Sequence, residues 1–282
     1  MPAHQLTTTS NPYPATALPE QWRQIDIEFT DWRCAASTAA RWLRPLLDDL
    51  VSDWWFLRKH PRWRIRYRIT SNENEYQLRI ALDLLASENI ITTWHPVIYE
   101  PEVLAFGGEP AMNLAHDLFG HDSPVVLDLL TTTGAQTIGR TELSLLAVSR
   151  MLRAAGLDWF EQGDVWARVA DLHRYPGAPN HTHAPRTCAA VHRLLTLDTD
   201  PTTPLADNGP LTPYTPWLAA YHHTGVELAA LARTGRLHRG LRAVLAHHVL
   251  FHWNRLTLDI REQHGLATTA RDDLLPTEHE SA

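Results

Sequence analysis

The sequence has little of what marks secreted, membrane-spanning or metal-binding proteins. Its 282 residues include only two cysteines, Cys34 and Cys188, which excludes a disulfide framework and a Cys-x-x-Cys metal site. No apolar run approaches the ~18 residues that a transmembrane helix needs, and the N-terminus lacks the apolar core of a signal peptide. The sequence therefore predicts a cytoplasmic, reduced protein without a membrane partner.

Motifs for common cofactors are missing as well. There is no phosphate-binding loop, no dinucleotide Gly-x-Gly-x-x-Gly turn and no Gly-x-Ser-x-Gly elbow. Among 17 histidines, His248 and His252 have helical ligand spacing, but no obvious third ligand accompanies them. We therefore expect neither a metal nor an organic cofactor. The net charge of −7, with basic residues clustered locally, argues against direct binding of nucleic acid.

What the sequence does have is a large apolar fraction and an unusual aromatic content. Hydrophobic residues make up 44%, enough for a sizeable core, and eleven tryptophans stand against three methionines. We expect a flexible N-terminus over residues 1–19, one domain over 20–265 and a flexible tail over 266–282.

The most informative stretch runs from Trp54 to Arg68. Its second half alternates Arg62, Arg64, Arg66 and Arg68 with apolar residues, which is the period-2 pattern of a half-buried strand. Two interpretations of this arginine ladder stay open. It is either a solvated strand face paired with acids on a neighbouring strand, or a surface that grips an anion through bidentate guanidinium groups.

Around this stretch the predicted elements form a recognisable order. Residues 24–29 read as a strand, 32–51 as a helix capped by Asp31 and kinked or split at Pro45, and 54–67 as a hairpin. A helix over 75–88, burying Leu78, Ile80, Ala81, Leu84 and Leu85, precedes a strand over 90–99. Strand–helix–strand–strand–helix–strand predicts an α+β fold with a ferredoxin-like antiparallel sheet.

Beyond Gly108 the pattern becomes helical. We expect helices near residues 109–132, 139–156, 161–173, 184–196, 214–234 and 236–263. The fold class is therefore α+β, with a ferredoxin-like sheet half packed against a mainly helical C-terminal half.

Three further stretches could carry chemistry. Tyr99, Glu100 and Glu102 lead into a Gly-Gly turn, and their carboxylates would lie near the arginine ladder if the two strands pair; ordinary salt bridging is the competing interpretation. The histidines and aspartates of 116–122 could transfer protons, but Asp122 and Ser123 read better as helix caps. His248, His252 and Arg255 share one helix face, which indicates either a site or a buried network.

The chain resembles the thiopeptide-type bacteriocin biosynthesis family, the same domain as the C-terminal elimination domain of lantibiotic dehydratases. The segment Trp-Phe-Leu-Arg-Lys-x-Pro-x-Trp-Arg-x-Arg from Trp55, the Tyr99–Gly108 stretch, the Phe119…Asp122-Ser123 pair and the closing His252-Trp253-Asn254-Arg255 occur in the expected order. The resemblance covers roughly residues 20–265.

The resemblance implies a lyase of lanthipeptide biosynthesis. Such domains take a precursor peptide whose Ser or Thr side chains carry a glutamyl ester, remove the α-proton, expel glutamate and leave dehydroalanine or dehydrobutyrine. Arg64 and Arg66 match the paired arginines that bind the glutamyl group, with His252 the candidate acid/base and Arg255 beside it. Substrate-binding roles would fall to Arg58, Arg68, Tyr99, Glu100, Glu102, Asp122, Ser123 and Asn254.

Two positions depart from the family pattern. Pro101 stands where elimination domains typically carry an arginine in Tyr-x-Arg-Glu, and Leu250 stands where they carry a histidine four residues before the Asn-Arg pair. These losses favour, to some extent, the pyridine synthases built on the same scaffold, which join two dehydroalanines in a formal [4+2] cycloaddition. A non-catalytic partner that binds a leader peptide is the third alternative.

The resemblance also implies the partners. They are a precursor peptide with leader and core, and a separate subunit that uses glutamyl-tRNA, so that tRNA would contact only that subunit. The sequence leaves the identity of the peptide and the catalytic base undecided, and it leaves a homodimer open.

Overall fold

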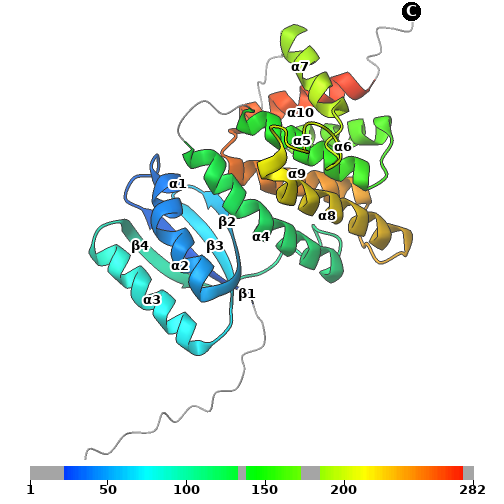
Figure 1. The fold of residues 1–282 in the computed structure, drawn as a ribbon. Coiled ribbons are helices and arrows are strands. Elements are labelled where there is room, and N and C mark those ends of the chain that lie inside the picture. Colours follow the sequence, from blue (N-terminus) through cyan, green and yellow to red (C-terminus); the bar gives the residue numbers. More distant parts are fainter. Residues whose placement is uncertain (1–21, 133–137, 173–184, 276–282) are drawn as a thin grey trace, which may run out of the picture.

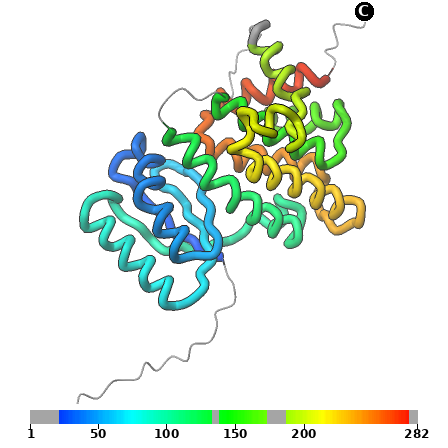
Figure 2. The backbone as a smooth tube through the Cα atoms, viewed as in Figure 1, coloured from blue at the N-terminus to red at the C-terminus, as the bar shows by residue number. Residues whose placement is uncertain are grey.

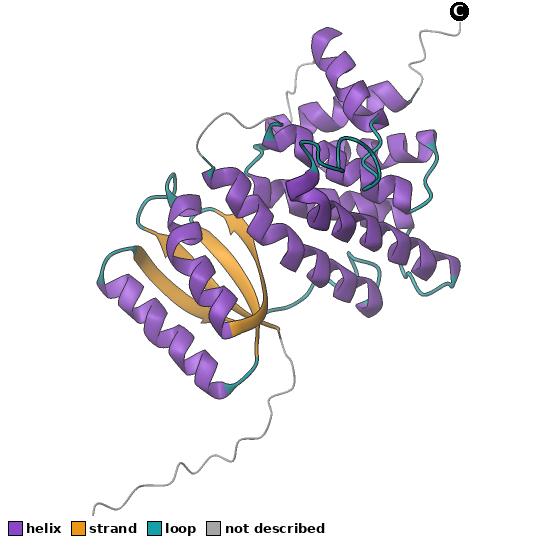
Figure 3. Cartoon of the chain, in the orientation of Figure 1, coloured by secondary structure: helices purple, strands orange, loops and turns teal. Residues whose placement is uncertain are grey.

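The computed structural model describes residues 22–132, 138–172 and 185–275, and the predicted flexible segment 1–19 lies outside these residues. All described strands lie in one half of the molecule, and the C-terminal half is helical (Figure 1, Figure 3). The backbone trace runs through the sheet half first and then stays within the helical half (Figure 2). This arrangement confirms the predicted α+β class.

The sheet half contains four antiparallel strands in the order β2-β3-β1-β4. The strands are β1 (Trp22–Phe29), β2 (Val51–Lys59), β3 (Arg62–Ile69) and β4 (Ile91–Val97). Helical segments join β1 to β2 and β3 to β4, and they cover one face of the sheet (Figure 1). The predicted ferredoxin-like order of elements is confirmed.

The first helical connection is one unbroken helical run that contains a π-helical turn. It consists of α1 (Ala35–Thr38), the π-helical turn η1 (Ala39–Leu43) and α2 (Arg44–Leu50). Pro45 lies in the first turn of α2, directly after the π-helical turn, so the irregularity predicted at Pro45 is a local change in helical hydrogen bonding and the helix does not split. The predicted cap is wrong, because Cys34 precedes α1 and Asp31 instead accepts a hydrogen bond from the backbone of Arg33.

The second connection, α3 (Asn72–Ser87), packs on the sheet through Leu78, Leu82 and Leu85. The predicted burial of Ile80 and Leu84 is wrong, since both are exposed. The buried residues follow i, i+4 and i+7 spacing, and the two exposed ones lie off that stripe.

The two faces of β3 differ as the alternation predicted. Trp63, Ile65 and Tyr67 are buried in the core. The arginines project from the opposite face, where the register places Arg64 opposite Asp26 and Arg62 opposite Glu28 on β1.

The helical half comprises seven long helices of the described chain. They are α4 (Glu109–Thr131), α5 (Arg140–Ala154), α6 (Trp159–Leu172), α7 (Pro185–Thr196), α8 (Thr215–Arg233), α9 (Leu241–Leu256) and α10 (Ile260–Leu274), with a short 3-10 turn η2 (Thr212–Tyr214) before α8. The helix predicted over 236–263 is two helices. Thr257 adopts a left-handed conformation that ends α9, and Asp259 with Glu262 forms a capping box that starts α10.

The chain end also differs from expectation. Residues 266–274, predicted to belong to a flexible tail, form the last turns of α10 and bury Ala267, Ala270 and Leu274. They pack with α6 and α7 rather than extending into solvent.

The two halves meet where α4 and α9 approach β2. The backbone N–H of Phe56 donates to Ser123 Oγ at 3.3 Å, and the ring of Trp55 lies 4.8 Å from that of Phe119 and 6.3 Å from that of Phe251. This aromatic contact fixes the helices against the arginine-bearing face of the sheet.

Candidate functional site

The structure distributes the predicted site residues over three places. Arg64, Arg66, Tyr99 and Glu102 come together with His247 on the arginine-bearing face of the sheet, which α4 and α9 approach, and we call this group the arginine cluster. A second group, Asp122, Ser123, His252 and Arg255, is buried between helices. Arg58 and Asn254 line a separate pocket.

Arg66 is the centre of the arginine cluster. Its side chain is only 6% exposed, its Nε donates to Gln24 Oε1 at 2.9 Å, and its guanidinium carbon lies 4.4 Å from the centroid of the Trp55 ring. Nη1 is buried and has no hydrogen-bond partner among the described residues. Burial lowers the pKa of Arg66 to about 10, so the group remains cationic at neutral pH. A buried cation with an unused donor is suited to binding an anion.

Glu102 approaches this cationic face from the loop after β4. It accepts a hydrogen bond from, or shares a proton with, His247 Nε2 at 3.1 Å. That hydrogen bond, together with the charges of His247, Arg66 and Arg64, lowers the pKa of Glu102 below its usual value. The predicted route was different, because β4 pairs with β1 and not with β3; the loop rather than a strand pair brings Glu102 near the arginines. Glu100 is exposed.

Tyr99 links the arginine cluster to a buried histidine. Its hydroxyl lies 2.8 Å from His116 Nε2, and its ring lies 5.3 Å from the guanidinium carbon of Arg66. Burial lowers the pKa of His116 to about 4, helped by the charges of Arg68 and Arg66, so this imidazole is neutral at physiological pH. Burial also raises the pKa of Tyr99, which keeps its hydroxyl protonated. Both members of this hydrogen-bonded pair are therefore neutral beside the cationic arginines.

Arg68, at the end of the ladder, is engaged with its surroundings. Its Nη1 lies 3.5 Å from Asp53 Oδ2, and its guanidinium carbon lies 5.2 Å from the centroid of the Trp22 ring. Arg62, at the other end, forms an ion pair with Glu28 at 3.4 Å. The acid-paired interpretation therefore describes the two ends of the ladder.

The second group forms a buried network around Asp122. Its Oδ2 lies 3.0 Å from His252 Nδ1 and accepts from Arg255 Nε at 2.8 Å. Its Oδ1 accepts from Trp217 Nε1 at 2.9 Å and from the Tyr221 hydroxyl at 2.8 Å. Burial alone would raise the pKa of Asp122, but the charges of His252 and Arg255 outweigh it and hold that pKa well below its usual range.

This network decides whether the shared helix face of His252 and Arg255 is a substrate site or a buried network. His252 is 1% exposed and Arg255 is 0% exposed, so the face is a buried network, and a substrate does not reach these side chains as they lie. The helix-cap interpretation of Asp122 and Ser123 is wrong, because both lie inside α4. Ser123 instead holds the backbone of β2. The substrate-contacting roles predicted for these residues gain no support from their positions.

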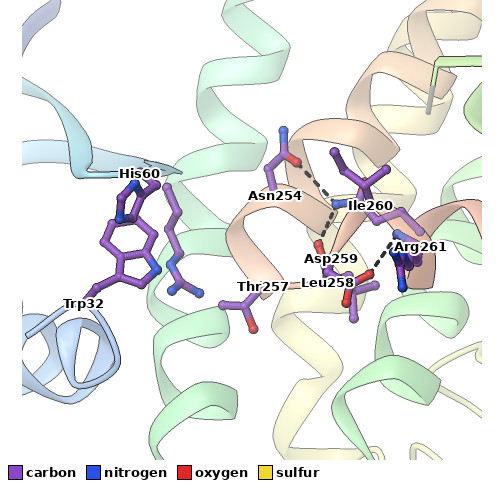
Figure 4. Close-up of a pocket in the computed structure, with 10 residues that line it drawn as sticks. Trp32, His60, Asn254, Thr257, Leu258, Asp259, Ile260 and Arg261 are labelled. Atoms are coloured by element: carbon purple, nitrogen blue, oxygen red, sulfur yellow. Dashed lines mark hydrogen bonds between the residues drawn. The ribbon is translucent and has the colours of Figure 1, made fainter. Parts of the chain in front are cut away.

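A pocket of about 660 Å³ lies between the two halves, away from the arginine cluster (Figure 4). The sheet half contributes Trp32, Arg58 and His60, and the α9–α10 junction contributes Asn254 and residues 257–261 with Gln263. Figure 4 shows Trp32 and His60 on one side and the junction residues on the other.

Several residues of these places escaped sequence reasoning. His247 and His116 lie within stretches that the sequence singled out, but only the fold shows that each meets a partner from the Tyr99–Glu102 segment. The sequence predicted Gln24 only as part of a strand and gave no sign of its contact with Arg66. Register alone places it opposite Arg66.

Metal and membrane signals add nothing to the site. Within residues 22–132, 138–172 and 185–275, no group of three His, Cys, Asp or Glu side chains is arranged to hold a metal ion. No helix in this part of the chain combines the length and the apolar character needed to cross a bilayer.

Comparison with known families decides the relationship. The family model described as "Lantibiotic biosynthesis dehydratase C-term" matches residues 22–271, which includes every residue of the arginine cluster. The chain belongs to this family. The matched region covers nearly all of the residues that the structure describes. None of the curated proteins compared with the chain matches it.

Two solved structures share the fold. The tRNA-dependent lantibiotic dehydratase MibB from Microbispora sp. 107891 has a TM-score of 0.65 and 17% identity, covering 93% of this chain but only 28% of its own. TsrL has a TM-score of 0.64 and 16% identity, covering 90% of this chain and 94% of its own. The chain thus spans about 28% of the length of MibB, and at these identities the likeness concerns the fold alone.

Proposed function

We propose that this family member eliminates glutamate from glutamylated Ser or Thr residues of a ribosomally made precursor peptide. The observation that carries the proposal is the buried, cationic Arg66 with its unpartnered Nη1, next to Arg64 on the arginine-bearing face of the sheet. A glutamyl ester presents a carboxylate before the reaction and a second carboxylate when it leaves, and bidentate guanidinium groups suit both.

The elimination involves three bond changes. A base removes the α-proton, the electron pair forms the Cα–Cβ double bond, and the Cβ–O bond breaks to release glutamate as a carboxylate. Arg66, together with the Tyr99 hydroxyl that its raised pKa keeps protonated, would stabilise negative charge that develops on the substrate carbonyl. Arg64 and Arg66 would hold the glutamyl carboxylates.

For the base we replace His252 by His247 as the candidate. His252 is buried in the Asp122 network, whereas His247 is 13% exposed in its side chain and is held by Glu102, whose side chain is 54% exposed. A carboxylate that accepts from an imidazole fixes the orientation of the ring. His247 lies three residues, close to one helical turn, before Leu250, the position where elimination domains typically carry histidine.

The test is mass spectrometry of a glutamylated Ser/Thr peptide incubated with the protein alone. The expected result is loss of the glutamyl group with formation of dehydroalanine or dehydrobutyrine. Arg64→Ala, Arg66→Ala and His247→Gln should each lower the rate by roughly 100-fold or more. Arg62→Ala is the matched control, because Arg62 lies on the same strand face but is already paired with Glu28; its rate should remain near wild type.

The competing outcomes separate the alternatives. An ester that persists with wild-type protein contradicts elimination. Conversion of a dehydroalanine-containing peptide to a pyridine, with release of its leader, would instead establish the [4+2] cycloaddition. Leu250 favours that second candidate, because it packs against the aromatic cluster around Trp55 and Phe119 and leaves an apolar wall where a histidine is typical. Binding without turnover in both assays would indicate a non-catalytic partner.

A further inference from the structure

The pocket between the two halves contains one arginine, Arg58, that no carboxylate of the described residues pairs with; the Asp259 carboxylate, which also lines the pocket, accepts from the backbone N–H groups of Arg261 and Glu262 instead. The guanidinium carbon of Arg58 lies 5.1 Å from the ring centroid of Trp32 and 5.2 Å from that of Trp63. Its Nε is buried without a hydrogen-bond partner, and no carboxylate of the described residues forms an ion pair with it. Burial lowers the pKa of Arg58 to about 10, and the nearby charge of Arg140 adds to this effect.

The same pocket also has an unused acceptor. Gln263 is 2% exposed; its Nε2 donates to the Leu258 carbonyl at 2.7 Å and contacts Asn254 Oδ1 at 3.4 Å, but its Oε1 is buried without a partner. Buried amide oxygens normally accept a hydrogen bond. An anion alone would not satisfy Gln263, whereas a peptide offers both a carboxylate for Arg58 and a backbone N–H for Gln263.

A second pocket continues the first. It has a volume of about 410 Å³, shares Leu258 and Arg261 with the first pocket, and is bounded by Gly265 and Leu266 of α10. Since an extended chain advances ~3.3 Å per residue, neighbouring side chains of one peptide can enter both pockets. We call the two pockets together the junction groove.

We propose that the junction groove binds an extended, acidic segment of the substrate peptide, placing an Asp or Glu side chain against Arg58 and an apolar side chain beside Leu266. This inference rests on the proposed peptide substrate, but it concerns a surface outside the arginine cluster. Arg58 and Asn254 then bind the peptide away from the residue that reacts, and elimination chemistry does not require them directly.

The test is fluorescence anisotropy with short labelled peptides that contain no Ser or Thr and therefore cannot react. Each peptide carries one Asp and one Leu in a Gly/Ala background, separated by zero to four residues in either order, and each has a matched Asn version. At least one Asp peptide should bind roughly tenfold more tightly than its Asn partner, the size of one charge-assisted contact.

Two variants and one control locate the contact. Arg58→Gln should abolish the difference between Asp and Asn peptides. Asn254→Asp keeps the acceptor that Gln263 Nε2 contacts but adds a negative charge, and it should abolish the difference as well. Arg41→Gln is the matched control, because Arg41 also lies over a tryptophan, at 5.0 Å from the Trp42 ring, but outside the groove; it should leave the difference unchanged.

Each other outcome overturns the proposal. Equal binding of all Asp and Asn peptides by folded wild-type protein does so, and so does discrimination that survives in both groove variants. Competition by unfractionated tRNA that disappears in Arg58→Gln would assign the groove to nucleic acid instead. Failure of the proposed lyase is distinguishable, because Arg64→Ala should lose turnover and keep the preference for Asp peptides.

Discussion

Asp122 shows how a single carboxylate can organise a helical core. It is fully buried and receives Arg255, His252, Trp217 and Tyr221, from two different helices. Removing one partner from a buried ionic network leaves the remaining charge without compensation, and this costs more than the network contributes in total. His252 and Arg255, which belong to the family's closing motif, therefore stabilise the packing of α4, α8 and α9.

At this residue we expect Asp122→Asn to lower the free energy of unfolding by about 3–5 kcal/mol, because Arg255 keeps its charge without a carboxylate. Urea denaturation followed by circular dichroism measures the change. Asp128→Asn is the control, since Asp128 forms an exposed ion pair with Arg44, and its effect should be several times smaller. A similar loss in both variants would contradict the role of the buried network.

His248 gives a prediction about pH. It is fully buried, both its ring nitrogens lack partners among the described residues, and burial lowers its pKa from 6.5 to about 3. The unfolded chain binds this proton below pH ~6.5 while the folded chain does not. Stability is therefore complete above that pH and declines as the pH falls toward 3; His116, with its pKa of about 4, contributes with the same sign.

The measurement is the free energy of unfolding of wild type and His248→Leu between pH 7.5 and 4.5. The variant should lose less stability than wild type across this range, because one proton-binding difference has been removed. His223→Leu is the control, since His223 is exposed, and its pH profile should follow wild type. A His248→Leu profile as steep as wild type would rule out this group as the source.

At the scale of elements, the close approach of α5 and α8 requires a glycine, whereas a glycine in α4 is not required by any close contact. Gly225 of α8 faces α5, and a Cβ at this position would collide with the carbonyl oxygen of Met151 and lie 3.0 Å from Ala154 Cβ. Gly120 of α4 has only the carbonyl oxygen of Trp54 nearby, at 4.0 Å. The same substitution should therefore have opposite effects in the two helices.

We expect Gly225→Ala to lower the free energy of unfolding by about 1–3 kcal/mol, because α5 and α8 must separate to admit the methyl group. Gly120→Ala should raise it by up to about 1 kcal/mol through better helix propensity. Thermal and urea unfolding of the two variants measure both signs. Equal effects would show that the α5–α8 approach is looser than the structure indicates.

The elements also show which sequence signals were sufficient. The alternation of β3 predicted both of its faces, because strand periodicity is a local property. The break between α9 and α10 was missed, although Asp259 and Glu262 have the spacing of a capping box. Apolar residues recur on both sides of the break, and the prediction followed them instead of the capping box. The helix over residues 266–274 was missed as well, because these residues were assigned to the tail.

At the scale of the whole molecule, the two halves share a hydrophobic core. Ile27 of β1, Val126 of α4 and Leu146 of α5 belong to one cluster of buried residues. The arginine cluster and the junction groove lie at different parts of the boundary between the halves, as the residues from both halves in each place show. Under the two proposals, one peptide would contact the arginine cluster and the junction groove with different residues.

The sequence alone determined the order of strands and helices, the alternating arginine face and the family resemblance, since each depends on local periodicity or on motif order. Only the tertiary structure decided which titratable groups meet. His252 and Arg255 share a helix face that is buried by α4 and α8, while His247, five residues before His252 on the same helix, meets Glu102 from 145 residues earlier. Such partners come from elements distant in sequence, and their burial and charge follow from packing that no local pattern specifies.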